Sequence, residues 1–161
     1  MPRQPGVPRP GVQGPSLKGR ALRLLSMREH SRAELERKLA AHEETPGDLA
    51  RALDELQAKG FISDERAAES VIHRRASRLG MGRLKQELQA KGLDASLVAE
   101  TMARLKGTEL ERAREVWRRR FGDHPPRDAA ERAKQSHFLA ARGFGGEVIR
   151  KVLAGGTGED D

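Results

Sequence analysis

Apolar residues recur along the chain at the three- and four-residue spacing of amphipathic helices. Leu49, Leu53 and Leu56 form one such stripe, and Leu84 and Leu88 form another. Segments with this period are separated by Gly, Pro, Ser and Thr, which are typical of helix ends. We therefore predict helices over residues 17–29, 32–42, 46–59, 64–79, 82–91, 95–106, 109–121, 128–142 and 146–154.

Helix-capping signals support these bounds. The capping-box pattern or its Asp variant occurs at residues 31–34, 45–48 and 108–111. We expect Pro46 at the first position of its helix, where the missing N–H costs nothing. Gly60, Gly92 and Gly143 each follow a Lys or Arg, which predicts a left-handed C-cap after a helix that ends in a cation.

The helices repeat in groups of three. At one constant offset, Leu35 and Leu39 of the first group correspond to Leu84 and Leu88 of the second, and a similar shift leads on to the third. Each group is too small to bury its own apolar face, so neighbouring groups must stack. We predict an all-α protein, a tandem array of three three-helix repeats that forms an elongated, curved, solenoid-like molecule. The predicted repeats cover residues 16–62, 63–107 and 108–155, and the second is the basic one.

The two ends of the chain differ from the helical part. Residues 1–15 contain five of the eight prolines and no apolar period, which predicts a disordered, basic Pro/Gly-rich tail or a product of start-site choice. Residues 156–161 end in Glu and Asp, and we expect them to form a frayed, acidic C-terminus.

Composition excludes several classes of protein. Cys is absent, which rules out a disulfide scaffold, a thiolate metal site and an iron–sulfur cluster. Four Phe, one Trp and no Tyr are too few for a strand-rich core. No apolar run approaches the roughly 18 residues of a membrane span. We expect a soluble, cytoplasmic, monomeric protein with no membrane partner.

Enzyme motifs are missing. Gly80 and Gly82 lack the third glycine and the preceding strand of a dinucleotide site, so we interpret them as part of a helix–helix turn. The five histidines lack metal-ligand spacing, and we expect them at the surface. They are His30, His42, His73, His124 and His137. We predict no catalytic residue, no cofactor and no metal.

The net charge of +7 predicts attraction to polyanions, although some of the Arg excess is also what a GC-rich genome would produce. The candidate binding face for a partner or DNA lies in the second repeat and consists of Arg66, Arg74, Arg75, Arg78, Arg83, Lys85 and Lys91. The alternative is an ordinary solvated face. A second basic patch consists of Arg118, Arg119 and Arg120, beside Trp117 and Phe121, which we expect in the core.

Several segments resemble the RecX regulators of recombination. Gly-Phe-Ile-Ser-Asp-Glu-Arg-Ala-Ala-Glu at 60–69, Arg75, Gly80 and Gln-Glu-Leu-Gln-Ala-Lys-Gly at 86–92 are similar to the central signature of that family. Residues 29–39 resemble the helix turn of its first unit, and residues 142–144 resemble that of its third. Ala67 and Met81 depart from the family pattern, which often has an aromatic or bulky residue at these positions.

The resemblance implies a regulator without chemistry of its own. It implies binding to the filament of RecA on single-stranded DNA, and inhibition of strand exchange, ATP hydrolysis and the SOS response. Single- or double-stranded DNA is a further candidate partner. The alternatives are a direct nucleic-acid-binding protein with helix-turn-helix-like units and no RecA partner, and a structural adaptor.

Overall fold

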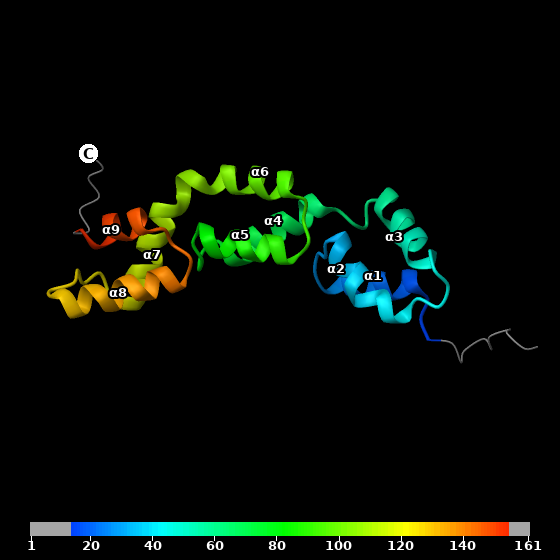
Figure 1. Ribbon diagram of the computed structural model, residues 1–161, viewed down its shortest axis with the longest axis horizontal. Coiled ribbons are helices and arrows are strands. Elements are labelled where there is room, and N and C mark those ends of the chain that lie inside the picture. The colour runs from blue at the N-terminus through cyan, green and yellow to red at the C-terminus, as the bar shows by residue number, and fades with distance from the viewer. Residues whose placement is uncertain (1–13, 155–161) are drawn as a thin grey trace, which may run out of the picture. The chain divides into compact units, whose positions relative to one another are not determined.

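The computed structural model describes residues 14–154, and all regular structure within them is helical (Figure 1). The predicted tail lies outside the described residues except for Gly14 and Pro15, and the predicted acidic end lies wholly outside them. The chain divides into two compact units, with the boundary after residue 63.

The first unit contains α1 (Leu17–Met27), α2 (Arg32–Leu39), the 3-10 turn η1 (Ala40–His42) and α3 (Asp48–Ala58). Each helix contributes one apolar stripe to a common core. Its buried members are Ala21, Leu35, Leu39, Leu49, Leu53, Leu56 and Ile62. The stripe that the sequence places on residues 49–56 is therefore the inner face of α3.

Capping in the first unit confirms one prediction and corrects another. Ser31 and Glu34 form the predicted capping box, in which each side chain accepts a hydrogen bond from the other's backbone N–H. The prediction for α3 is wrong, because Pro46 lies in a turn before the helix and Gly47 is the N-cap. The Glu43 carboxylate instead accepts from the Leu49 N–H at 2.8 Å, so a residue before the turn provides the cap.

The second unit begins with α4 (Asp64–Arg75), α5 (Met81–Ala90) and α6 (Ala95–Leu105), which lie side by side (Figure 1). Their core consists of Ala68, Val71, Leu88, Leu93 and Val98. The helix predicted over 64–79 ends at Arg75, and in the turn that follows the carbonyls of Ala76 and Leu79 accept hydrogen bonds from the Arg112 guanidinium.

The 3-10 turn η2 (Lys106–Thr108) connects α6 to α7 (Glu109–Phe121). The capping box predicted at 108–111 is wrong: the Thr108 hydroxyl donates to the Leu105 carbonyl, and the backbone stays helical at this position. No N-terminal cap is needed where one helix continues into the next.

The helices α7, α8 (Ala129–Ala141) and α9 (Gly146–Leu153) enclose the last core. Trp117 is buried there as predicted, and its indole N–H donates to Gln135 Oε1 at 2.9 Å. Gln135 in turn donates to the His124 carbonyl at 3.1 Å, so this buried polar pair is satisfied. The other core residues are Ala113, Val116, Leu139, Phe144, Ile149, Val152 and Leu153.

Two glycine-containing turns join these halves of the second unit. Gly80 N–H donates to the Arg142 carbonyl at 2.8 Å, and Gly82 N–H donates to the Gly143 carbonyl at 3.0 Å. Gly143 has a φ of +90°, which confirms the left-handed C-cap predicted after α8. The left-handed glycines predicted at 60 and 92 are confirmed as well.

A buried carboxylate and a half-buried guanidinium reinforce this junction. Glu109 accepts hydrogen bonds from the Met81 N–H at 2.9 Å and the Gly145 N–H at 3.3 Å. Arg112, one turn further along α7, donates to the Leu79 carbonyl at 2.5 Å. Burial lowers the pKa of Arg112, and the charge of Glu109 acts in the opposite direction. The N-terminus of α7 therefore fixes the turn between α4 and α5.

Candidate functional site

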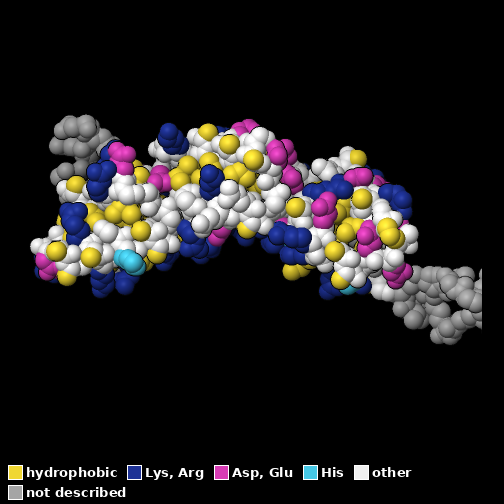
Figure 2. Space-filling model, viewed as in Figure 1, with side chains coloured by type: hydrophobic (Ala, Val, Ile, Leu, Met, Phe, Trp, Pro, Cys, Tyr) yellow, Lys and Arg dark blue, Asp and Glu magenta, His cyan; other side chains and the backbone are white. Residues whose placement is uncertain are grey.

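The predicted basic face is distributed over α4, the following turn and α5. Arg66, Arg74, Arg78 and Lys85 are exposed, whereas Arg75, Arg83 and Lys91 are half-buried. Figure 2 shows Lys and Arg side chains along the edge of the molecule below α5 in this view. The individual contacts of these residues divide them into groups with different roles.

Arg75 serves as a connection between two helices. Its Nε and one terminal nitrogen donate to the Glu87 carboxylate at distances of 2.8 to 3.1 Å, in a two-pronged ion pair that joins α4 to α5. The hydrogen bonds and charge of Glu87 raise the pKa of Arg75. Such planar pairing is geometrically specific. The Arg75 charge is therefore compensated within the protein.

Arg83 and Lys85 have different neighbours, although both lie on α5. Arg83 packs against Gly143 and donates to the Ala141 carbonyl at 3.0 Å, so it forms part of the junction with α8. Lys85 lines an open, mainly apolar cavity of about 840 Å³ between α5 and α6, together with Gln89 and Met102. The two cations are close in sequence, but they lie on different faces of α5.

Arg74 and Arg78 are the cations of this face that are best placed to meet an anionic partner. Both are exposed, and neither has a carboxylate oxygen within 4.0 Å in residues 14–154. Arg74 donates to the Ser70 carbonyl one turn earlier, at 3.2 Å. Because no acidic side chain of residues 14–154 forms an ion pair with them, the charge of these two guanidinium groups is available to a partner at the surface.

The second basic patch is partly neutralised. Arg118 lies 3.8 Å from carboxylate oxygens of Glu115 and Asp123, and Arg119 lies 3.4 Å from Glu115. Arg120 has no carboxylate partner among the described residues and lies instead over the rings of two phenylalanines. The three consecutive arginines therefore differ in whether a carboxylate offsets their charge. The sequence cannot show this difference, because the three residues are identical.

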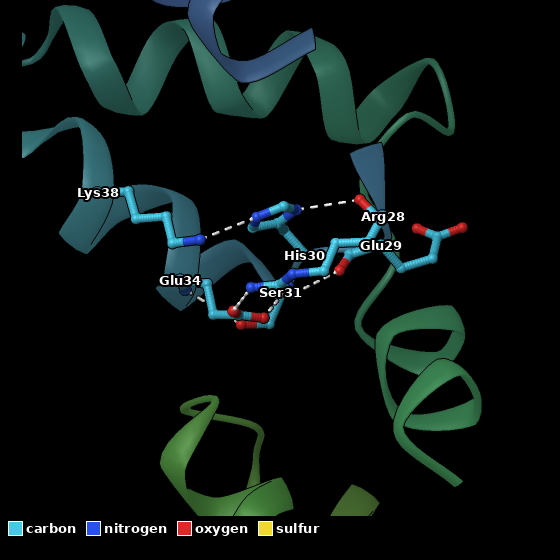
Figure 3. Close-up of polar contacts among 6 residues, drawn as sticks. All are labelled: Arg28, Glu29, His30, Ser31, Glu34 and Lys38. Carbon is cyan, nitrogen blue, oxygen red and sulfur yellow. Dashed lines mark hydrogen bonds and ion pairs between the residues drawn. The ribbon is translucent and has the colours of Figure 1, made fainter. Parts of the chain in front are cut away.

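His30 corrects the expectation that all five histidines lie at the surface. The other four are exposed, but His30 is buried between α1 and α2. Its Nδ1 is 3.0 Å from the Arg28 carbonyl oxygen and its Nε2 is 3.1 Å from Lys38 Nζ. Figure 3 draws both contacts as dashed lines. The Lys38 ammonium can only donate, so the ring is a neutral imidazole with its proton on Nδ1. Burial is the main cause of its lowered pKa.

The surroundings of His30 complete a polar cluster. Arg28 donates to Glu34 at 2.9 Å, and Glu34 also takes part in the capping box with Ser31 (Figure 3). These contacts connect the end of α1 to both ends of α2, because Ser31 and Glu34 lie at its start and Lys38 lies in its last turn, so we interpret the cluster as structural. Within the described part of the chain, no group of three His, Asp or Glu side chains could hold a metal ion.

None of the helices between residues 14 and 154 has both the length and the apolar character needed to cross a membrane.

Sequence comparison identifies one family across the whole helical region. Family models of the first, second and third three-helix domains of RecX match residues 18–56, 63–102 and 108–153. These matches, in that order, confirm the resemblance seen in the sequence and the predicted all-α tandem arrangement of three three-helix units.

Curated relatives and solved structures agree with this result. The chain is 54% identical over 129 residues to the regulatory protein RecX of Leptothrix cholodnii, covering 80% of this chain and 82% of that one. It is 50% identical over 131 residues to the regulatory protein RecX of Ralstonia nicotianae, covering 81% and 82%. The crystal structure of RecX from Lactobacillus salivarius shares the fold, with a TM-score of 0.69, 21% identity and coverage of 86% and 92%.

Proposed function

Because the chain belongs to the RecX family of regulatory proteins, we propose that it binds the filament that RecA forms on single-stranded DNA. Binding would inhibit the recombinase, ATPase and SOS co-protease activities of RecA. The observation that carries this proposal is the ordered match of all three RecX domains, together with relatives whose name is regulatory protein RecX.

The exposed arginines support a polyanionic partner. Among the residues that the structure describes, no carboxylate lies within 4.0 Å of Arg74 or Arg78, and a nucleoprotein filament offers phosphates and acidic protein surface. Opposite charges across an interface accelerate encounter and fix orientation. Binding should weaken as salt rises, by about 0.7 in the log–log slope for each single-strand phosphate that is contacted. We propose Arg74 and Arg78 as the centre of the filament-binding face.

Three further members of the predicted face, Arg75, Arg83 and Lys85, have supporting roles in this proposal. Arg75 and Arg83 position α5 through Glu87 and Ala141, and Lys85 borders the cavity beside α6. Removing the Arg75 or Arg83 side chain would therefore disturb the fold before it disturbed a partner contact. The face that binds is smaller than the run of cations in the sequence.

Regulation without chemistry follows from linkage. A ligand that binds one state of a filament more tightly than another shifts the population toward the preferred state. We propose that the three units covering residues 16–62, 63–107 and 108–155 contact the filament as linked modules. Linked contacts strengthen binding beyond any single one, provided that they engage together.

Co-sedimentation with RecA on single-stranded DNA, with and without nucleotide, tests the proposal. We expect the chain to pellet with the nucleotide-bound filament at concentrations at which bare single-stranded DNA retains much less of it. Equal retention on bare DNA and on the filament would contradict a RecA-directed function. It would favour the direct nucleic-acid-binding alternative.

The matched variants are Arg74→Gln with Arg78→Gln, and Arg118→Gln with Arg119→Gln. Both pairs remove two positive charges, but within the described part of the chain only the first pair lacks carboxylate neighbours. We expect the first pair to weaken co-sedimentation about tenfold, which corresponds to about 1.4 kcal/mol. The second pair should stay within about twofold of the unchanged chain, because its charges are already offset.

A further inference from the structure

Two phenylalanine rings and two arginines form a compact cluster on the surface of α7 and α8. The rings of Phe121 and Phe138 meet edge to face, with centroids 5.4 Å apart. The Arg120 guanidinium carbon lies 5.3 Å from the centroid of Phe121 and 5.7 Å from that of Phe138. Arg142, at the end of α8, lies 4.9 Å from the Phe138 centroid. Both guanidinium groups are thus held by aromatic rings.

The cations of this cluster are not neutralised. In residues 14–154, no carboxylate oxygen lies within 4.0 Å of Arg120, Lys134 or Arg142. The contrast with Arg118 and Arg119, the two preceding residues of the same helix, is direct, because both pair with Glu115. A cation placed over a ring remains a full charge, and its hydrogen-bond donors remain available at the edge of the guanidinium.

The cluster borders an open cavity of about 500 Å³ between α7 and α8. Arg120 and Lys134 are exposed, and the two phenylalanine rings are half-buried. The cavity is therefore bordered by exposed cationic side chains and lined by half-buried aromatic rings. The lining residues are Arg120, Phe121, Ala133, Lys134, His137 and Phe138.

We infer that this cluster is a binding site for single-stranded nucleic acid. Phosphates would contact Arg120, Lys134 and Arg142, and a base would stack on the aromatic and guanidinium surfaces beside Phe138. Unpaired bases stack in this way on aromatic rings and on guanidinium planes. The inference goes beyond the filament-binding face, because the site would contact DNA directly and on different helices.

The chemistry of the cluster favours a nucleic acid over an acidic peptide. A peptide carboxylate needs only the cations, whereas the lining also offers aromatic surface that matches a planar base. It favours a single strand over a duplex, because paired bases hide their faces in the stack. The lining contains no Asn or Gln amide to recognise base edges, so we expect little sequence preference.

Fluorescence anisotropy of a labelled oligothymidine with the full chain, without RecA, tests the inference. We expect Arg120→Gln with Arg142→Gln to weaken binding at least tenfold and to lower the salt slope by about 1.4 for two lost phosphate contacts. The charge-matched control, Arg118→Gln with Arg119→Gln, should stay within about twofold. Binding by the Arg120 and Arg142 variant equal to that of the control would overturn the site.

A second variant tests the stacking part. Phe138→Leu keeps an apolar side chain but removes the ring, and we expect about fivefold weaker binding of oligothymidine. Competition by polyglutamate should be weak for the unchanged chain, because an acidic peptide cannot stack. If polyglutamate competes as well as oligothymidine of equal charge, the site is a general anion surface and the inference is wrong.

These results are separable from the filament proposal. RecA is absent from the assay, so loss of oligothymidine binding does not depend on whether the chain recognises RecA. Circular dichroism of each variant confirms that it is folded before binding is compared. Arg120 is exposed, Arg142 is half-buried, and both lie outside the apolar core. The variant that replaces these two arginines should therefore fold even if the Phe138→Leu variant does not.

Discussion

Gly80 packs directly on the backbone of Gly143, and neither glycine can carry a side chain without movement of a neighbouring backbone. A Cβ on Gly80 would lie 2.5 Å from the carbonyl carbon of Gly143, and a Cβ on Gly143 would clash with the backbone nitrogen of Arg83. Both approaches are far inside van der Waals contact. The absence of two side chains is thus what allows the α4–α5 turn to dock on the α8–α9 turn.

We predict that Gly80→Ala lowers the free energy of unfolding by about 1–3 kcal/mol, the usual cost of overpacking. Gly143→Ala should cost more, because an alanine would also be strained at a φ of +90°. Urea denaturation measures both. Gly146→Ala is the control, since nothing lies within 4 Å of its added Cβ, and it should change stability by about 0.5 kcal/mol or less. Equal effects at Gly80 and Gly146 would contradict the close contact.

Leu88 is fully buried in the core of α4, α5 and α6, as its place in the apolar stripe predicts. Replacing it with Ala removes apolar contacts and leaves a cavity. We expect Leu88→Ala to cost about 2–5 kcal/mol, measured as a loss in urea denaturation. Both leucines of α5 are buried, so the control is Gln89→Ala at an exposed position of the same helix. This control should leave the free energy of unfolding nearly unchanged.

The sequence predicts the helices well and their capping less well. Apolar spacing depends only on which face of a helix is buried, and this is encoded locally in segments such as 49–56. The caps at 45–48 and 108–111 fail for a different reason. Glu43, which lies before the turn, caps α3, and η2 leaves no free helix end at Thr108. Both outcomes depend on the path of the chain beyond the motif.

The candidate site is predictable only in part, because a charge run does not reveal its neighbours. Glu87 pairs with Arg75 from another helix, and Arg83 finds the Ala141 carbonyl, which is distant in sequence. The pairing of Phe121 with Phe138 likewise joins two helices. Residues 142–144 resemble a motif of the family's third unit, but nothing in the sequence places the Arg142 side chain over a ring.

The buried histidine predicts a pH dependence of stability. Its pKa is lowered in the folded chain, so between that value and 6.5 the unfolded state binds more protons than the folded state. Stability is therefore complete above pH 6.5 and is lost as the pH falls through the folded pKa. We expect the free energy of unfolding to fall between pH 7.5 and pH 5.5, and His30→Gln should flatten this slope. The surface control His73→Gln should leave the slope unchanged. If His30→Gln also leaves it unchanged, the pH dependence of stability comes from other groups.

The Arg75–Glu87 pair separates a structural role from a binding role. Both side chains are partly exposed, at 34% and 27%, so the ion pair is screened by solvent. We expect Arg75→Gln to lower the free energy of unfolding by about 1 kcal/mol. Its affinity for the RecA filament should stay within about twofold of the unchanged chain. A tenfold loss of affinity for the filament without loss of stability would show that Arg75 contacts the partner directly.

The ATPase activity of RecA on single-stranded DNA, titrated with the chain, tests the central claim most directly. We predict that the unchanged chain and Arg118→Gln with Arg119→Gln inhibit hydrolysis at similar concentrations, whereas Arg74→Gln with Arg78→Gln needs about ten times more protein. If hydrolysis proceeds at its full rate at concentrations of the unchanged chain that saturate co-sedimentation with the filament, the chain is not an inhibitor of RecA.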